Sequence, residues 1–363
     1  MSTDKKINWY RCKVDKQVMS PLMETSDFKG FRQVLPQLGL FVVTSALTYL
    51  SLINISASNW EWAVPLCILA WFIHGTFSSF LGLTGPVHEL CHKTPFKSKS
   101  WNEFFLKVYS FLSWSDPVSF RPSHVRHHQV TVHHDLDEEV VLPMSINPRD
   151  IHFWMWAFGF NIRGAFNTIR DRASEACGVI RFEYTKKVIP ESNVKGRLEH
   201  KRWAQTMVGG HILLAAIFIL TGHWPLIFIV NLGAFYFAWL AIACGMPQHI
   251  GMQPDISDFR KCCRTYTCNW LPGFLYWNMQ YHVEHHMFPA VPFYNLPKLR
   301  QALTHDLPPA PHGLIATWKE IIHILKLQKQ DPAYCFQALI PQNSTPGEMT
   351  DDSVLEKEAS AAV

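Results

Sequence analysis

Residues 35–55 read LPQLGLFVVTSALTYLSLINI and contain no charged side chain. An apolar run of this length can cross a bilayer as one helix, because a crossing takes about 20 residues. The run lies inside a longer stretch, residues 33–92, that has no Lys or Arg, and residues 203–259 form a second such stretch. All 33 basic residues lie outside these two stretches. This partition of charge predicts an integral membrane protein.

Each stretch contains two apolar runs separated by a short polar break, at residues 56–61 and 222–225. The runs are 35–55, 62–84, 205–221 and 226–246. They predict an all-α membrane protein with four transmembrane helices in two hairpins. A buried helical core of a soluble protein is the alternative, and four charge-poor runs near the length of a crossing argue against it.

The distribution of Lys and Arg also predicts the orientation of the helices. The two breaks carry no basic residue, so both are expected to face away from the cytosol. The N-terminal segment 1–33 and residues 93–202 and 248–310 are then cytosolic and form a helical cap. Both termini are expected on the same side.

The remaining segments and the composition complete the predicted organisation. Residues 34–310 form the membrane domain, residues 311–340 a cytosolic helical segment, and the polar residues 341–363 a disordered tail. No cleavable signal peptide is expected. Nine scattered cysteines predict reduced thiols. The net charge of +4 is mild and does not indicate a nucleic-acid partner.

Three histidine clusters stand out: HELCH at residues 88–92, HVRHH at 124–128 and HVEHH at 282–286. Residues three and four apart share a helix face, so each cluster can direct its imidazoles toward one point. Neutral imidazole is a good ligand for iron, zinc or copper. With one more histidine just after the fourth run, the predicted ligands are His88, His92, His124, His127, His128, His249, His282, His285 and His286.

The predicted topology places all nine histidines on the cytosolic side. His88 and His249 follow the cytosolic ends of the second and fourth runs, and the other two clusters lie in cytosolic segments. The positions of Lys and Arg alone predict the orientation of the helices. The location of all nine histidines on one side is therefore an independent observation that agrees with it. Nine ligands are too many for one ion, and four or five for each of two ions is reasonable. Nearly all-nitrogen sites with open positions suit iron and oxygen chemistry.

Ligating histidines need acceptors for their second ring nitrogen. Carboxylates beside the clusters are candidates for this role, and surface solvation is the alternative for each of them: Glu89, Asp116, Asp135, Asp137 and Glu284. His133 and His134 are expected to lie around the site or on the surface. His74 lies about four turns before His88 on nearly the same helix face. It is a candidate for lining a substrate tunnel, and a helix–helix hydrogen bond is the alternative.

The three clusters and the four-run plan resemble the membrane fatty acid desaturase and hydroxylase superfamily over residues 35–305. The tail of the third cluster, Met287-Phe288-Pro289, and residues 292–299 also resemble that superfamily. The resemblance implies two iron ions, O2 as co-substrate and a lipid or fatty acyl substrate. It also implies electrons from a cytochrome b5 or ferredoxin type of donor. The membrane would be the endoplasmic reticulum in a eukaryote and the inner membrane in a bacterium.

Some positions depart from the superfamily pattern. The five-residue first cluster is shorter than that of acyl-CoA delta-9 desaturases. Those enzymes carry an Asn four residues before the extra histidine, where this chain has Gly245, and Asn278 is the candidate substitute. No His-Pro-Gly-Gly segment of a fused cytochrome is present. The third cluster begins with His282, where fused front-end desaturases often have Gln.

Several reactions stay open from the sequence. Desaturation of an acyl chain is the first choice, and hydroxylation of a lipid, alkane or carotenoid is the second. A zinc-dependent membrane hydrolase would need only three or four histidines and a metal-bound water. A metal transporter would place its ligands near the middle of the bilayer.

Overall fold

A computed structural model describes residues 7–140, 142, 146 and 149–342 of the chain. Within these residues the regular structure is helical, and the only β-type pairings are three isolated bridges. The all-α prediction is therefore confirmed. The predicted disordered tail lies outside the described residues except for its first two positions.

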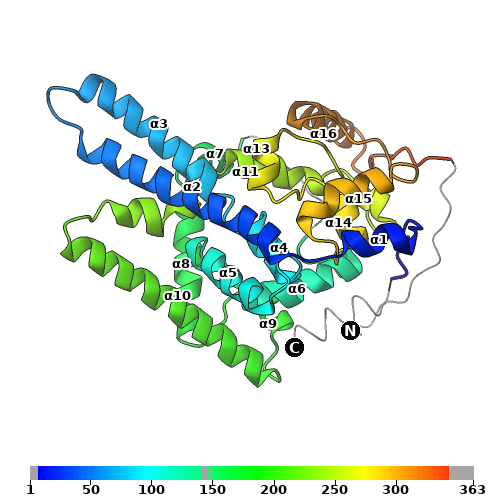
Figure 1. Cartoon of the computed structure of the whole chain (residues 1–363), viewed down its shortest axis with the longest axis horizontal. Coiled ribbons are helices and arrows are strands. Elements are labelled where there is room, and N and C mark those ends of the chain that lie inside the picture. The colour runs from blue at the N-terminus through cyan, green and yellow to red at the C-terminus, as the bar shows by residue number, and fades with distance from the viewer. Residues whose placement is uncertain (1–6, 141, 143–145, 147–148, 343–363) are drawn as a thin grey trace.

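The first predicted hairpin is present as α2 (Asp27–Ile53) and α3 (Trp60–Ser78), which extend together from the rest of the molecule (Figure 1). Ser26 caps α2 by accepting a hydrogen bond from the backbone N–H of Lys29. Thr48 of α2 donates to the carbonyl of Ala70 in α3. Many apolar side chains on both helices are exposed, as expected for a surface that meets lipid.

The third predicted run belongs to a longer helix, α10 (Val194–Leu220). The sequence predicts a start near residue 205, because the residues before it include charged side chains. In the structure those residues belong to the same helix, and α10 packs against α8 (Ile162–Ala176). By length and composition, α2 and α10 are the two described helices long and apolar enough to cross a membrane. The count of four crossings stays a prediction.

The prediction of one continuous helix over residues 226–246 is wrong. A π-helical turn (Ile227–Asn231) and a 3-10 turn (Gly233–Phe235) are followed by extended backbone at Tyr236 and then by α11 (Trp239–Gly245). The break occurs where α7 (Ile151–Phe158) meets this segment. The N–H of Phe237 donates to the carbonyl of Gly159, and the N–H of Ala238 donates to that of Trp156. These bonds replace the helical ones, which is what backbone in a lipid environment requires.

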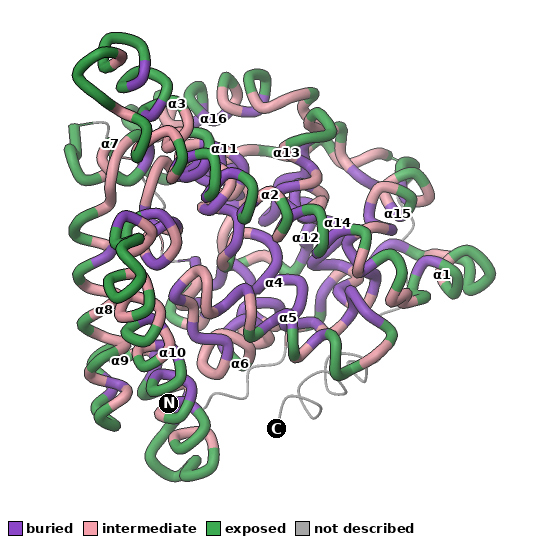
Figure 2. The backbone as a smooth tube through the Cα atoms, turned by 60° about the vertical axis from the view of Figure 1, so that its left-hand side comes forward, coloured by how far each residue is buried: buried purple, intermediate pink, exposed green. Residues whose placement is uncertain are grey.

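The second run also ends early, because α3 stops at Ser78 and residues 79–85 are irregular. Beyond them, short helices form a densely buried centre that is traced in purple in Figure 2. It includes α4 (Pro86–Cys91), α6 (Pro117–Val130), α12 (Phe259–Cys262) and α14 (His282–Met287). Large side chains such as Trp277 and Tyr109 are fully buried around these helices.

The other helices surround this centre. They are α1 (Lys16–Leu22), α5 (Lys99–Leu112), α9 (Glu183–Val188), α13 (Trp270–Leu275), α15 (Leu296–Ala302) and α16 (Leu314–Gln328), with 3-10 turns at Met246–Gln248 and Phe293–Asn295. α16 lies within the segment predicted to be helical at 311–340. All nine cysteines are free thiols, as expected.

Gly75 provides a test of how α3 packs against the broken segment. A Cβ atom at Gly75 would lie 2.8 Å from side-chain atoms of Tyr236 and Phe237, whereas a Cβ at Gly39 of α2 would meet nothing within 4 Å. Gly75→Val should therefore lower stability by about 1–3 kcal/mol through overpacking. Gly39→Val should change stability by about 0.5 kcal/mol or less. Thermal denaturation midpoints of the detergent-solubilised variants measure both effects, and equal midpoints would contradict the packing.

Candidate metal centre

Three short helices carry the histidine clusters, and local sequence explains where they begin. α4 holds His88 and ends at Cys91, one residue before its C-cap His92, and it starts at Pro86, whose fixed φ suits a first helical position. α6 carries the second cluster, and the Asp116 side chain caps it by accepting from the N–H groups of Val118 and Ser119. α14 carries the third cluster. His249 follows the 3-10 turn after α11.

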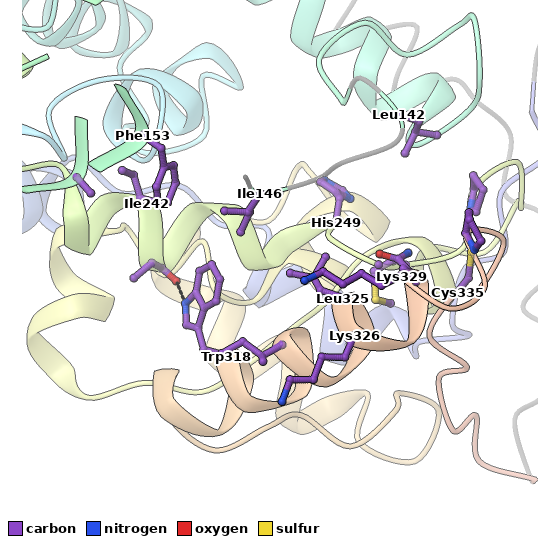
Figure 3. A pocket seen from close by; sticks show the side chains of 18 of the residues that line it. Leu142, Ile146, Phe153, Ile242, His249, Trp318, Leu325, Lys326, Lys329 and Cys335 are labelled. Atoms are coloured by element: carbon purple, nitrogen blue, oxygen red, sulfur yellow. Dashed lines mark hydrogen bonds between the residues drawn. The ribbon is translucent and has the colours of Figure 1, made fainter. Parts of the chain in front are cut away.

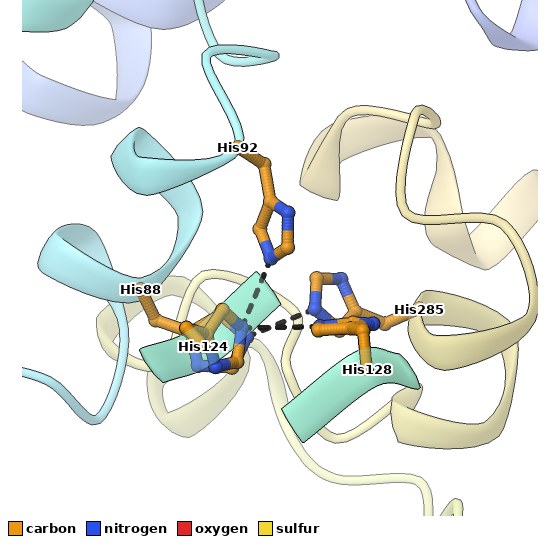
Figure 4. Close-up of side chains that lie close together, drawn as sticks. All are labelled: His88, His92, His124, His128 and His285. Atoms are coloured by element: carbon orange, nitrogen blue, oxygen red, sulfur yellow. Dashed lines mark hydrogen bonds between the residues drawn. The ribbon is translucent and has the colours of Figure 1, made fainter. Parts of the chain in front are cut away.

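All nine predicted ligand residues are at least nine-tenths buried. They form two groups in which one ring nitrogen from each histidine lies within 4.8 Å of the others. The first group is His88, His92, His124, His128 and His285 (Figure 4), and the second group is His127, His249, His282 and His286. The structure thus brings all nine histidines together at one place in the fold, and their role as metal ligands stays a prediction.

The division between the two groups differs from the expectation that each cluster points at one site. In α6 and α14 the first and last histidines, four residues apart, belong to one group, and the middle histidine belongs to the other. Side chains four residues apart lie on nearly the same helix face, whereas the middle position is rotated away from them. Each of these two helices therefore contributes to both groups and ties them together.

The spacing of the inner nitrogens fits a bound cation. In the first group, His92 Nε2 lies 3.1 Å from His124 Nε2, and His88 Nε2 lies 2.9 Å from His285 Nε2. In the second group, His282 Nε2 lies 2.9 Å from His249 Nε2. At a metal–nitrogen distance of about 2.1 Å, neighbouring nitrogens of an octahedral ion lie about 3.0 Å apart. The observed distances between the Nε2 atoms match this separation of neighbouring ligand nitrogens.

The outer nitrogens show which inner nitrogens are available to bind a metal ion. The Nδ1 atom of His249 lies 3.0 Å from the carbonyl oxygen of Cys262, which can only accept, so Nδ1 carries the proton. The Nδ1 atom of His127 lies 2.8 Å from a carboxylate oxygen of Asp137, and the Nδ1 atom of His124 lies 3.1 Å from one of Glu139, so these Nδ1 atoms also carry the proton. A neutral imidazole has one N–H, so the inner Nε2 atoms of these rings present lone pairs. Lone pairs about 3 Å apart are stable when a metal ion lies between them.

Burial keeps the rings in the neutral form that binds metal. Desolvation lowers the pKa of His92 to about 3 and that of His249 to about 4. It also places the pKa values of six further ligands well below the ordinary range, with neighbouring histidines adding to the effect: His88, His124, His128, His282, His285 and His286. For His127, burial also lowers the pKa, but the Asp137 carboxylate outweighs it and raises the pKa.

The predicted carboxylate partners are partly placed where they were expected. Glu89 lies 3.2 Å from Nδ1 of His285, and Asp137 accepts from His127. Glu284 instead accepts from Thr265 and pairs with Arg300.

The remaining candidates have other surroundings. Asp116 caps α6 and pairs with His200 at 2.9 Å. Asp135 is exposed with a φ of 60°, and Asn278 donates to the carbonyl of Phe293. Glu139, which pairs with His124, was missed, because four acidic residues follow the second cluster closely and spacing alone does not separate them.

The three other histidines singled out by their sequence positions lie outside the two groups. His74 is fully buried and bridges helices, with Nδ1 2.9 Å from the Thr44 hydroxyl and Nε2 2.9 Å from the carbonyl oxygen of Ile229. These are the contacts of the helix–helix alternative, and a tunnel role for His74 stays a prediction. His133 is buried beside the ligands and His134 is exposed, as expected for residues around the site.

An apolar cavity of about 1080 Å³ adjoins the second group, because His249 is part of its wall (Figure 3). Side chains of α7, α11 and α16 form most of the lining. The indole N–H of Trp318 donates to the carbonyl of Ala243 and fixes α16 against α11. Ligand cavities typically enclose roughly 300–1,000 Å³, so this one has room for a large apolar molecule.

Comparison with known proteins agrees with this geometry. The profile of the fatty acid desaturase family matches residues 59–318, which include all nine histidines and most of the chain. The chain belongs to the fatty acid desaturase family. It is also 24% identical over 279 residues to the sphingolipid delta(4)-desaturase DES1 of Xenopus tropicalis, covering 73% of this chain and 72% of the relative. The protein is thus a desaturase-like oxidoreductase of lipid metabolism with histidine groups that fit metal binding.

Asp137 and Asp135 provide a matched pair in one loop. Asp137→Asn should weaken metal retention by about 10–100-fold, because the amide holds the His127 ring less firmly and no longer favours its protonated Nδ1. Asp135→Asn should retain the metal, since Asp135 is exposed and Asn tolerates its positive φ. Metal content per chain after graded chelator treatment is the measurement. Equal retention by the two variants would show that Asp137 does not support the site.

Proposed function

We propose that this desaturase-family chain is an oxygen-dependent di-iron membrane enzyme that introduces a double bond into the acyl chain of a lipid. One observation carries the proposal. Two groups of inward-facing imidazole nitrogens lie together, and an apolar cavity large enough for a long chain shares His249 with the second group. The metal groups and the space for an apolar substrate are therefore adjacent.

The nitrogen donors favour iron over a single zinc. One ion would be held by the first group of five histidines and the other by the second group of four. A catalytic zinc site normally has three protein ligands and a water, so nine imidazoles in two groups exceed what a hydrolase needs. When bound, the iron pair would supply the oxygen chemistry in which O2, two electrons and two protons, together with two substrate hydrogens, become two waters.

The chain's own residues would position the substrate and keep the ligands fixed. Apolar side chains of Phe153, Trp239 and Ile242 line the cavity and would exclude water from the acyl chain. Asp137 and Glu139 hold the outer nitrogens of their histidines, so the rings cannot rotate away from the metal.

The proposed topology places the metal groups on the cytosolic side of the membrane. It is supported by the exposed apolar side chains of α2, α3 and α10 and by the absence of Lys and Arg from residues 33–92 and 203–259. Both termini would then be cytosolic. A cytochrome b5 or ferredoxin type of protein would supply the two electrons from that side.

Lipid profiling under ¹⁸O2 tests the reaction itself. Cells expressing the chain are compared with cells expressing His88→Ala, and their acyl lipids are analysed by mass spectrometry. Desaturation predicts products two mass units lighter than the substrate and free of ¹⁸O. Hydroxylation predicts incorporation of one ¹⁸O atom and would replace the proposed reaction.

The two metal groups are tested by single substitutions. Replacing any ligand, for example His127 or His285, with Ala should reduce product formation by at least 100-fold and lower the iron content while leaving membrane insertion intact. His152→Ala and His305→Ala are controls, because both side chains are exposed and lie outside the groups. Iron analysis of the purified variants accompanies the product assay. Full activity in two or more ligand variants would contradict the assignment of these histidines as metal ligands.

A further inference from the structure

Two lysines, Lys326 and Lys329, line the cavity beside His249. No Asp or Glu is among the described residues of its wall. The rest of the wall is mostly aliphatic and aromatic. The cavity therefore combines a long apolar surface with two ammonium groups, one turn apart at the end of α16 (Figure 3).

Neither ammonium group has a carboxylate partner among the ion pairs of the described residues. This differs from Lys186 and Lys187, which pair with Glu183 at 2.7 Å and with Glu138 at 2.6 Å. Lys326 and Lys329 are also exposed, so both are accessible from solution. A bound anion could contact both without displacing a partner from within the protein.

We propose that Lys326 and Lys329 bind an anionic phosphate or carboxylate group at the head of the acyl substrate. This rests on the proposed function, because it takes the cavity to be the place of the acyl chain. The head would lie at the two lysines, and the chain would lie along the apolar wall that includes His249. The substrate class is thereby an anionic acyl lipid rather than a neutral one.

The position of the cavity suits the head of a lipid. Trp154 and Phe158 of α7 line the cavity and are also 42% and 53% exposed. Exposed aromatic side chains are typical of the boundary between bilayer and water. A lipid that enters between α7 and α16 would keep its head at that level, where long Lys side chains reach the phosphate layer.

The end of a helix attracts cations in any case, because its last carbonyl groups carry partial negative charge. That effect explains basic residues near the end of α16 but does not require their side chains to line a cavity. Lys319 on the same helix is exposed and does not line the cavity, so it is a control for a general loss of positive charge from α16.

The test measures binding to the iron-loaded, full-length protein in nanodiscs of uncharged lipid. Radiolabelled hexadecyl phosphate, hexadecanoate and hexadecanol share one chain and differ in the head. The wild type should bind at least one anion about tenfold or more tightly than the alcohol, as expected for hydrogen bonds to charged groups. The double variant Lys326→Glu/Lys329→Glu should lose this preference, and Lys319→Glu should retain it.

The outcomes separate the two proposals. A preference for the phosphate indicates a phosphorylated lipid, and a preference for the carboxylate indicates a free fatty acid. Equal binding of alcohol and anions by the wild type, or an equal loss in Lys319→Glu, overturns the head-group site. If lipid profiling finds new double bonds only in neutral lipids, the site is wrong and the desaturase proposal stands. If anions bind through these lysines but no double bond forms, the head-group site stands and the desaturase proposal is wrong.

Discussion

The inner ring nitrogens of nine buried histidines face one another in two groups, an arrangement that a metal ion between them would stabilise. The acceptors around the site enforce this direction, since the Cys262 carbonyl and the Asp137 carboxylate require protons on the outer nitrogens. Burial disfavours a second proton on His249. The short helices α4, α6 and α14 meet at this point, so a bound metal ion would also stabilise their packing.

The two groups are also mechanically connected. α6 and α14 each give two histidines, four residues apart, to one group and the middle histidine to the other. A rotation of either helix would therefore disturb both groups of histidines together. The N-cap of α6 extends this coupling outward, because Asp116 also pairs with His200 of α10. The long helix α10 is thereby attached to the start of the helix that carries the second cluster.

The sequence was sufficient to predict which histidines lie together, because helical spacing fixes which side chains share a face. The nine histidines, the partners Glu89 and Asp137, and the hairpin of α2 and α3 follow from spacing and hydropathy. The division of each H-x-x-H-H cluster between the two groups could not be predicted from the sequence, because it depends on how α6 and α14 cross. Glu139 was missed for a similar reason, since the turn after the second cluster decides which carboxylate reaches His124.

The largest error in the predicted fold lies beside the proposed substrate cavity. Hydropathy favours one helix over residues 226–246, yet the backbone breaks near Tyr236 and bonds to the end of α7. The break separates α11 from the preceding turns and brings Trp239 and Ile242 to the cavity wall, opposite residues of α7 and α16. A continuous helix would satisfy its own backbone and would not bond to α7 in this way. The local conflict between sequence pattern and structure thus falls where an apolar space adjoins His249, as expected when a functional site overrides local preference.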